Sequence, residues 1–496
     1  MLSCESINKT TVDPKRFHPR NAKSNFHAFG KTDALSCKRE HACGDRWGWM
    51  RKSIRGAERS REIGPLTISV TRLRCAARRT AAAAAVGTLV VSTQGLAAGF
   101  LIRETSTIGV ATVYAGNGSR ADAASTVFNN PAGMTRLTQN ELEGGLAVIL
   151  PSVPFRGDAT LGNTSVGGAN GDAGRAAFVP NLHWVFGITD RLKGGISVTA
   201  PFGNSVVYDR GWPGRYLGIK TAALSVDINP GIAYRLSDML SIGGGVSAQY
   251  FDLEATSAIP QFAILAPGAP DAYLRFKGND WAFGYNFGVL FELLGTTRFG
   301  LTYRSHLNHR LEGDLDFTGA SPFLALVSGA AAADAHLPST IGFSVTKDFT
   351  AALILSADIQ FNDWSVFKRV IIESQNAPIV DEQRYRDSWM VSVGGIYRLN
   401  DDWTLRAGLA YDQTPITDHY RTVTLPDNNR YLIGLGFGYR LTDTLYLDAG
   451  YQHSFAAHAD MNKSLNNTDL FTHAIVLNGQ YNVTVDLVAF SLRYKY

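Results

Sequence analysis

The chain has 496 residues and a formal net charge of +4, from 47 Lys and Arg against 43 Asp and Glu. Residues 1–97 hold 18 of the basic and 7 of the acidic side chains, so the rest of the chain has 29 basic and 36 acidic side chains and a net charge of −7. The basic excess therefore belongs to the N-terminal region and gives no support to a nucleic-acid partner. All four cysteines also precede residue 98, which excludes a disulfide framework or a thiolate metal site after it, and we predict no cofactor and no metal.

Residues 1–70 are polar, rich in basic side chains and without periodicity, although a complete export signal follows them. We interpret them as a disordered extension without a role in the working protein, with translation starting later, for example at Met50. A genuine cytoplasmic extension ahead of the signal is the alternative.

A secretory signal peptide is predicted at residues 71–97. Four arginines precede eleven apolar or small residues at 81–91, and Gly95-Leu96-Ala97 supplies the small residues of a cleavage site. Eleven residues are too few to cross a bilayer as a helix, and no later run of 18 apolar residues predicts a helical span. We therefore expect cleavage after Ala97.

Residues 98–137 are rich in Gly, Ala, Ser and Asn and do not alternate as strands do. A compact segment ahead of a barrel is either a plug in the lumen or a periplasmic tail. Its small residues suit packing in a confined space, and its few charges argue against a free tail, so we predict a hatch. Asn130-Pro131-Ala132 within it has the chemistry of a turn, because Pro fixes φ and Asn bonds to its own backbone.

Residues 138–496 alternate between apolar and polar or small side chains, which is typical of β-strands with unlike faces. Trp403, Leu405 and Leu409 fall on one face, while Arg406 and Asp412 fall on the other. Lipid outside and a lumen inside a membrane barrel require this alternation. The predicted fold class is all-β, a 14-stranded antiparallel transmembrane β-barrel plugged by an N-terminal hatch, with a soluble sandwich as the alternative.

The fourteen strands are predicted at 141–151, 176–187, 193–207, 221–236, 239–255, 278–294, 297–315, 336–347, 350–364, 386–399, 402–414, 428–440, 444–456 and 484–496. Short polar turns are predicted at 189–191, 236–238, 295–297, 347–349, 399–401 and 441–443. Short turns at one end and long loops at the other are typical of bacterial outer-membrane barrels. The last strand carries Phe490, Leu492, Tyr494 and Tyr496 on one face, and we expect the barrel assembly machinery to recognise it.

The third strand contains Pro201-Phe202-Gly203. Because Pro cannot donate to a ladder and Gly weakens it, we predict that the wall bulges or breaks here. A strand that simply ends at Ala200 is the alternative.

Two long loops, at 256–277 and 316–335, are apolar where loops are usually polar, which favours an extracellular binding groove over loops that merely pack on each other. The predicted groove residues are Ile259, Phe262, Ile264, Leu265, Phe323, Leu324 and Leu326. On the inner faces, Arg398, Arg406 and Arg440 are candidates for contacting a ligand carboxylate, although lumen arginines more often pair with Asp or Glu.

The chain after residue 97 resembles the FadL family of outer-membrane transporters for long-chain fatty acids and other hydrophobic compounds. The motifs that carry the resemblance are Ala98-Gly99-Phe100, Tyr114-Ala115-Gly116, Asn130-Pro131-Ala132, Val179-Pro180-Asn181-Leu182-His183, Trp281-Ala282-Phe283-Gly284-Tyr285-Asn286, Leu301-Thr302-Tyr303-Arg304-Ser305, Leu399-Asn400-Asp401-Asp402-Trp403 and Leu425-Pro426-Asp427-Asn428-Asn429-Arg430.

The resemblance implies a hatch at 98–137, a lateral gap at the kink in strand three, and a ligand pocket to which the mature N-terminus, Ala98, Gly99 and Phe100, contributes. It departs at one position, because the family's pocket arginine falls near Ser257 here. Aromatic or aliphatic hydrocarbons therefore stand beside fatty acids as expected ligands.

These features predict a monomeric, non-enzymatic protein of the bacterial outer membrane that passes long-chain fatty acids by passive diffusion through a lumen pocket and the lateral opening. Its expected partners are the hydrophobic ligand and outer-membrane lipid. Uptake of hydrocarbons is the alternative function. A lipid hydrolase is disfavoured because no G-x-S-x-G, H-E-x-x-H or Walker motif occurs, and a general porin is disfavoured by the hatch and the apolar loops.

Overall fold

The computed structural model describes residues 99–261, 268–322, 326, 328–374, 378–465 and 475–496. The extension at 1–70, the signal peptide at 71–97 and Ala98 lie outside the described residues, so what the sequence predicts for them stays a prediction. Within the described residues, no helix is long and apolar enough to cross a membrane.

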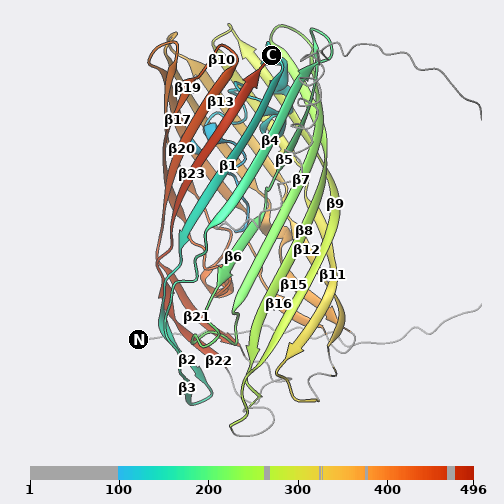
Figure 1. The fold of residues 1–496 in the computed structure, drawn as a ribbon, viewed down its shortest axis with the longest axis vertical. Helices are drawn as coiled ribbons and strands as arrows, with labels where there is room; N and C mark the ends of the chain where they lie inside the picture. Colours follow the sequence, from blue (N-terminus) through green and yellow to red (C-terminus); the bar gives the residue numbers. More distant parts are fainter. Residues whose placement is uncertain (1–98, 262–267, 323–325, 327, 375–377, 466–474) are drawn as a thin grey trace, which may run out of the picture. The chain divides into compact units, whose positions relative to one another are not determined.

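Fourteen antiparallel wall strands, counted in the described part of the chain, form one closed barrel (Figure 1). In chain order they are β1 (Glu141–Ser152), β4 (Ala177–Gly187), β5 (Leu192–Thr199) with β6 (Gly203–Val207), β7 (Lys220–Arg235), β8 (Leu240–Ile259), β9 (Ala272–Leu293), β10 (Thr297–Arg304) with β11 (Leu307–Thr318), β12 (Gly329–Leu337) with β13 (Thr340–Asp348), β14 (Leu353–Asn362) with β15 (Arg369–Ser374), β16 (Ile379–Glu382) with β17 (Ser388–Arg398), β18 (Trp403–Asp412), β19 (Arg430–Arg440), β20 (Leu445–Ala456) and β23 (Thr484–Lys495). The first and last strands close the wall, from Glu141 opposite Lys495 to Ser152 opposite Thr484. The predicted barrel and strand number are confirmed.

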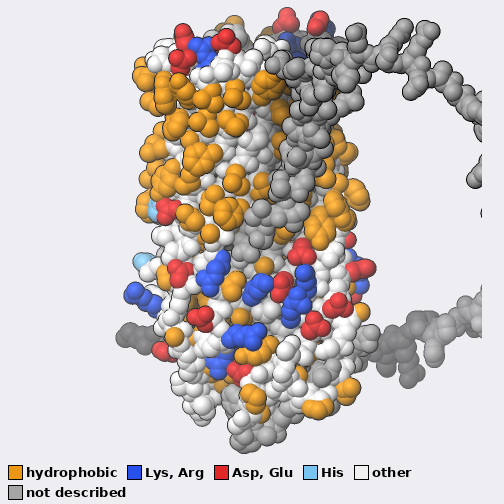
Figure 2. All heavy atoms as spheres, in the orientation of Figure 1, with side chains coloured by type: hydrophobic (Ala, Val, Ile, Leu, Met, Phe, Trp, Pro, Cys, Tyr) orange, Lys and Arg blue, Asp and Glu red, His pale blue; other side chains and the backbone are white. Residues whose placement is uncertain are grey.

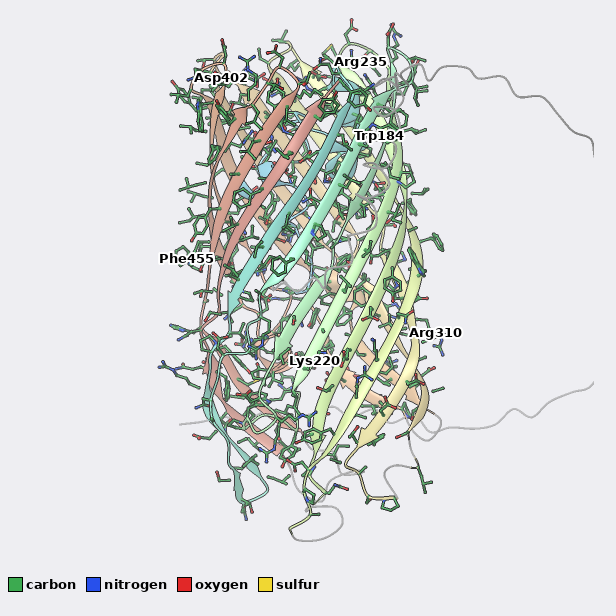
Figure 3. All side chains as sticks on the ribbon, in the orientation of Figure 1. Trp184, Lys220, Arg235, Arg310, Asp402 and Phe455 are labelled. Carbon is green, nitrogen blue, oxygen red and sulfur yellow. The ribbon has the colours of Figure 1, made fainter. Side chains whose placement is uncertain are left out.

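The two faces of each wall strand differ as predicted. On β18, Trp403, Leu405 and Leu409 are 39, 43 and 55% exposed, while Arg406 and Asp412 are 6 and 2% exposed. Figure 2 shows apolar side chains covering the wall toward the short turns, with charged side chains gathered toward the long loops. In Figure 3, Trp184 and Phe455 lie on the apolar stretch, and Lys220 and Arg310 lie nearer the loops.

The strands extend further toward the loops than the sequence indicates. The predicted loops 256–277 and 316–335 are shorter, because β8 continues to Ile259, β9 starts at Ala272, β11 reaches Thr318 and β12 starts at Gly329. Beyond the bilayer the outer face meets water and no longer needs apolar side chains, so the alternation fades while the hydrogen-bonded ladder continues.

A small sheet at the loop end was not predicted. It contains β21 (Ala459–Leu465), β22 (Ile475–Tyr481), β2 (Phe155–Leu161) and β3 (Thr164–Val166), in that spatial order. These segments come from the first and last long loops, and Figure 1 places them together at the lower end of the barrel. Their pairing is long-range in sequence, so no local pattern indicates it.

Residues 99–137, named here the N-terminal segment, pack against the inner wall through α2 (Thr107–Ala111), α3 (Thr126–Asn129) and η1 (Pro131–Arg136). Inner-face glycines allow the close approach. A Cβ on Gly408 would lie 2.2 Å from the Thr112 carbonyl oxygen, and one on Gly300 would lie 1.9 Å from the Gly118 carbonyl oxygen. Glycine is therefore required here by contact between backbones.

Candidate functional site: an aromatic cluster beside a break in the wall

The third wall strand is broken at the predicted position. β5 ends at Thr199 and β6 begins at Gly203. β5 pairs with both of its neighbours, β4 and β7, whereas β6 pairs with β7 alone among the described strands. β4 finds its partner on β5 only from Leu182 onward, so its residues 177–181 face a gap in the ladder. The alternative of a strand that simply ends at Ala200 is wrong, because pairing with β7 resumes beyond the break.

The N-terminal segment pairs with this break. Leu101 and Phe202 form an antiparallel bridge. The Ile102 amide donates to the Pro201 carbonyl at 2.8 Å, and the Gly203 amide donates to the Phe100 carbonyl at 2.9 Å. Pro201 and Gly203 thus take their backbone partners from the N-terminal segment, whereas the backbone of Phe202 bonds to Ser225 on β7.

Five buried rings, named here the aromatic cluster, surround the start of the N-terminal segment: Phe100, Phe202, Trp364, Phe367 and Tyr385. The ring centroid of Phe100 lies 4.9 Å from that of Trp364, 5.3 Å from that of Phe367 and 6.0 Å from that of Phe202. These tilted and edge-on contacts add to the burial of apolar area. The Trp364 indole Nε1 has no hydrogen-bond partner, so a polar atom of a ligand would find a free donor there.

The sequence did not indicate three members of this cluster. Trp364 lies on η2 (Trp364–Val366), in the break between β14 and β15, and Phe367 follows directly. The available signal was the spacing of Trp364 and Phe367, which are three residues apart and so suit a helical turn instead of an alternating strand. Nothing local indicates that Tyr385 joins them.

Charged groups hold the N-terminal segment beside the cluster. The Gly99 amide donates to the Asp427 carboxylate at 3.0 Å. Arg103 and Arg430 contact the two carboxylate oxygens of Asp412, at 3.1 and 3.0 Å. Burial raises the pKa of the Asp427 carboxyl above its usual range, against the attraction of Arg430. The site is therefore apolar on one side and internally paired on the other.

Asn130-Pro131-Ala132 does more than turn the chain. Asn130 accepts from the Ala132 amide at 3.1 Å and starts η1, with Pro at the first helical position. Its side-chain amide donates to the carbonyls of Gly118, at 2.6 Å, and Val289 on β9, at 3.1 Å. This residue therefore ties the N-terminal segment to the wall.

The three candidate arginines do not meet the aromatic cluster. Arg406 faces the lumen and contacts Asp448 at 2.8 Å. Arg398 donates to the Ala351 carbonyl at 2.9 Å and Arg440 contacts Asp402 at 3.0 Å, both at the short-turn end. Each therefore has a structural partner, and a role as a ligand contact stays a prediction.

Ile259, one of the predicted groove residues, is buried in the structure. This side chain is 6% exposed and packs against Ala272 and Phe317, so it is not open to a ligand. Leu326 is 78% exposed. The other predicted groove residues, Phe262, Ile264, Leu265, Phe323 and Leu324, lie outside the described residues.

A closed antiparallel wall with an apolar outer band defines a transmembrane β-barrel of the bacterial outer membrane. The chain belongs to the OMPP1/FadL/TodX family of outer membrane transport proteins, whose family model matches residues 88–496. The resemblance read from the motifs is thereby confirmed. The family and its solved relatives are transporters and channels, not enzymes.

Among similar proteins, a long-chain fatty acid transport protein of Escherichia coli O6:H1 is 28% identical over 416 residues, covering 75% of this chain and 91% of that protein. Outer membrane protein P1 of Haemophilus influenzae is 29% identical over 400 residues, covering 72% of this chain and 86% of that protein. A Pseudomonas aeruginosa FadL homologue has a TM-score of 0.74 at 24% identity, covering 80% of this chain and 99% of that one. The toluene transporter TodX of P. putida has a TM-score of 0.58 at 16% identity, covering 79% of this chain and 98% of that one. These two structures support the fold alone.

Proposed function

We propose that this protein carries long-chain fatty acids across the outer membrane by passive diffusion, through the aromatic cluster and sideways through the break in strand three. The observation that carries the proposal is the pairing of Phe100 and Ile102 with Pro201 and Gly203, which joins the buried cluster to the gap in the wall. Relatives named as long-chain fatty acid transport proteins, aligned over nine-tenths of their own length, support the substrate class.

Residues 99–137 act as a hatch in this proposal and close the bore along its axis. A ligand captured at the loop end gains roughly 25 cal/mol for each Å² of apolar surface that it buries. It then displaces the Phe100 ring from its neighbours. When the N-terminal segment leaves strand three, the ligand moves through the gap beside residues 177–181 into lipid.

Uptake of aromatic hydrocarbons is the second candidate function. Two observations favour it: the buried lining at Phe100 is made of aromatic rings, and Ser257 stands on β8 near the position of the family's pocket arginine. A channel for toluene among the structural neighbours has the same fold. Aliphatic hydrocarbons belong to the same alternative.

Growth separates the two functions. A strain deleted for this gene, with and without the complementing gene, is grown on oleate or on toluene as sole carbon source, with uptake of the radiolabelled compounds measured over minutes. We expect the complemented strain alone to take up oleate quickly. Equal oleate uptake in both strains would reject the fatty-acid proposal, and a difference confined to toluene would establish the hydrocarbon function.

A further inference from the structure

A cavity lies inside the barrel, next to the aromatic cluster. Its volume is about 140 Å³, and it is lined by Leu101, Phe128 and Phe202 on one part and by Asn286, Thr302 and Arg304 on another. A water molecule needs roughly 10–15 Å³ by a comparable measure, so the cavity has room for a head group. Phe202 belongs to both sites, which makes the cavity a neighbour of the proposed route.

Arg304 ends β10 and faces this cavity without an ionic partner. One guanidinium nitrogen, Nη2, donates to the Phe128 carbonyl at 3.1 Å, and the guanidinium stacks over the Phe128 ring at 3.9 Å. The other, Nη1, is buried and has no hydrogen-bond partner. No carboxylate of the described residues comes within ion-pair distance of Arg304, whereas Arg298, Arg406 and Arg430 each contact one.

Asp227 on β7 is the acidic group whose negative charge acts on Arg304, although the two are not within ion-pair distance. Its Oδ2 accepts hydrogen bonds from Ser247 and Gln249, whereas its Oδ1 is buried and has no hydrogen-bond partner. A buried cation without a counter-charge in contact with it is unfavourable. The planar guanidinium group can bind a carboxylate through two parallel hydrogen bonds. The free Nη1 therefore points to an incoming anion.

We propose that Arg304 binds the carboxylate of an amphiphile inside the barrel, with the apolar chain lying toward Leu101, Phe128 and Phe202. The inference rests on the proposed function and deepens it, since it assigns this site to anionic ligands and not to neutral ones of equal length. Arg304 would also provide a positive charge for the ligand, although the family's pocket arginine is replaced near Ser257.

The test compares two probes with the same chain, hexadecanoate and hexadecan-1-ol, which differ in the charged group. Binding of each is measured by equilibrium titration to the purified full-length barrel in a non-ionic detergent. We expect Arg304→Gln to weaken the binding of hexadecanoate at least tenfold and the binding of hexadecan-1-ol less than twofold. Arg304→Lys keeps the charge and should recover most of the hexadecanoate affinity.

Arg235→Gln is the matched control. Arg235 also projects from the wall and donates to a carbonyl of the N-terminal segment, that of Thr135, but it does not line the cavity and lies at the short-turn end (Figure 3). Its replacement should leave the ratio of the two affinities unchanged.

Three outcomes would overturn the Arg304 site: equal losses for both probes, no loss for either, or identical behaviour of the Gln and Lys variants. Equal losses would mean that Arg304 only holds Phe128. If the unaltered protein binds neither probe and does not support growth on oleate, the proposed function fails as well. Normal binding and growth with an unaffected Arg304→Gln variant would remove this site alone.

Discussion

At the scale of single residues, inner-wall glycines mark the places where the N-terminal segment contacts the wall. A Cβ on Gly408 or Gly300 would collide with a carbonyl oxygen of that segment. Along each strand, apolar side chains face the lipid at alternate positions. At some of the positions between them, which face inward, glycine allows the wall backbone to contact the N-terminal segment directly. Adding a side chain at such a position tests whether the segment closes the bore.

Gly408→Val should displace the N-terminal segment, because the new Cβ would lie 2.2 Å from the Thr112 carbonyl oxygen. We expect a clear rise in single-channel conductance in planar bilayers. Ala407→Val is the control, since residue 407 is exposed on the outer face of the same strand and the change adds the same kind of side chain there. Equal, low conductance of both variants would contradict closure by this contact.

Asp448 is the shared partner of two buried arginines, Arg406 at 2.8 Å and Arg493 at 2.6 Å. Asp448→Asn leaves both cations with a neutral partner, and breaking a buried pair costs about 3–5 kcal/mol. The temperature at which the barrel unfolds in detergent should fall markedly. Asp443→Asn, on an exposed turn, should leave it unchanged, and a similar temperature for both variants would show that the buried charges are not coupled.

At the scale of elements, the sequence predicted the strands, the turns and the strand break whose residue patterns are local. The two-residue period on β18, the six short turns and the break at Pro201-Phe202-Gly203 all follow from local chemistry. The extensions of β8 and β9, the sheet of β2, β3, β21 and β22, and the meeting of Phe100 with Trp364 were missed. Each depends on residues far apart in sequence and on a region where water, not lipid, surrounds the wall.

Repairing strand three tests the lateral route. The pair Pro201→Val and Gly203→Ala restores an N–H and a side chain. The added methyl at 203 meets the flexible end of Ile102 at 2.7 Å and the Ala223 carbonyl oxygen at 3.3 Å. We expect uptake of oleate to fall at least tenfold while the purified protein still binds it.

Pro230→Val is the control for that repair. Pro230 lies on β7 opposite Ile196, so its replacement adds an N–H to a wall strand away from the break. Uptake should remain normal in this variant. Normal uptake in the repaired variant as well would show that ligands leave by another path.

At the scale of the whole molecule, we propose that residues 99–137 close the barrel along its axis and that the break in strand three opens its side. The ladder is complete between β1 and β23, and it is interrupted between β4 and β6. The unaltered protein should therefore show no steady open-pore current in planar bilayers. A stable ohmic current would favour a general porin.

A reversible disulfide between positions 101 and 202 tests most directly whether ligands leave through the break in strand three. The two residues form a non-hydrogen-bonded antiparallel pair, whose Cα atoms lie about 4.5 Å apart, within the ~4.4–6.8 Å that a disulfide spans. No cysteine follows residue 97, so Leu101→Cys with Phe202→Cys introduces the only pair after that point. We predict that oleate uptake stops in the oxidised protein and returns on reduction of the same sample. Equal uptake in both states would contradict exit through the break in strand three.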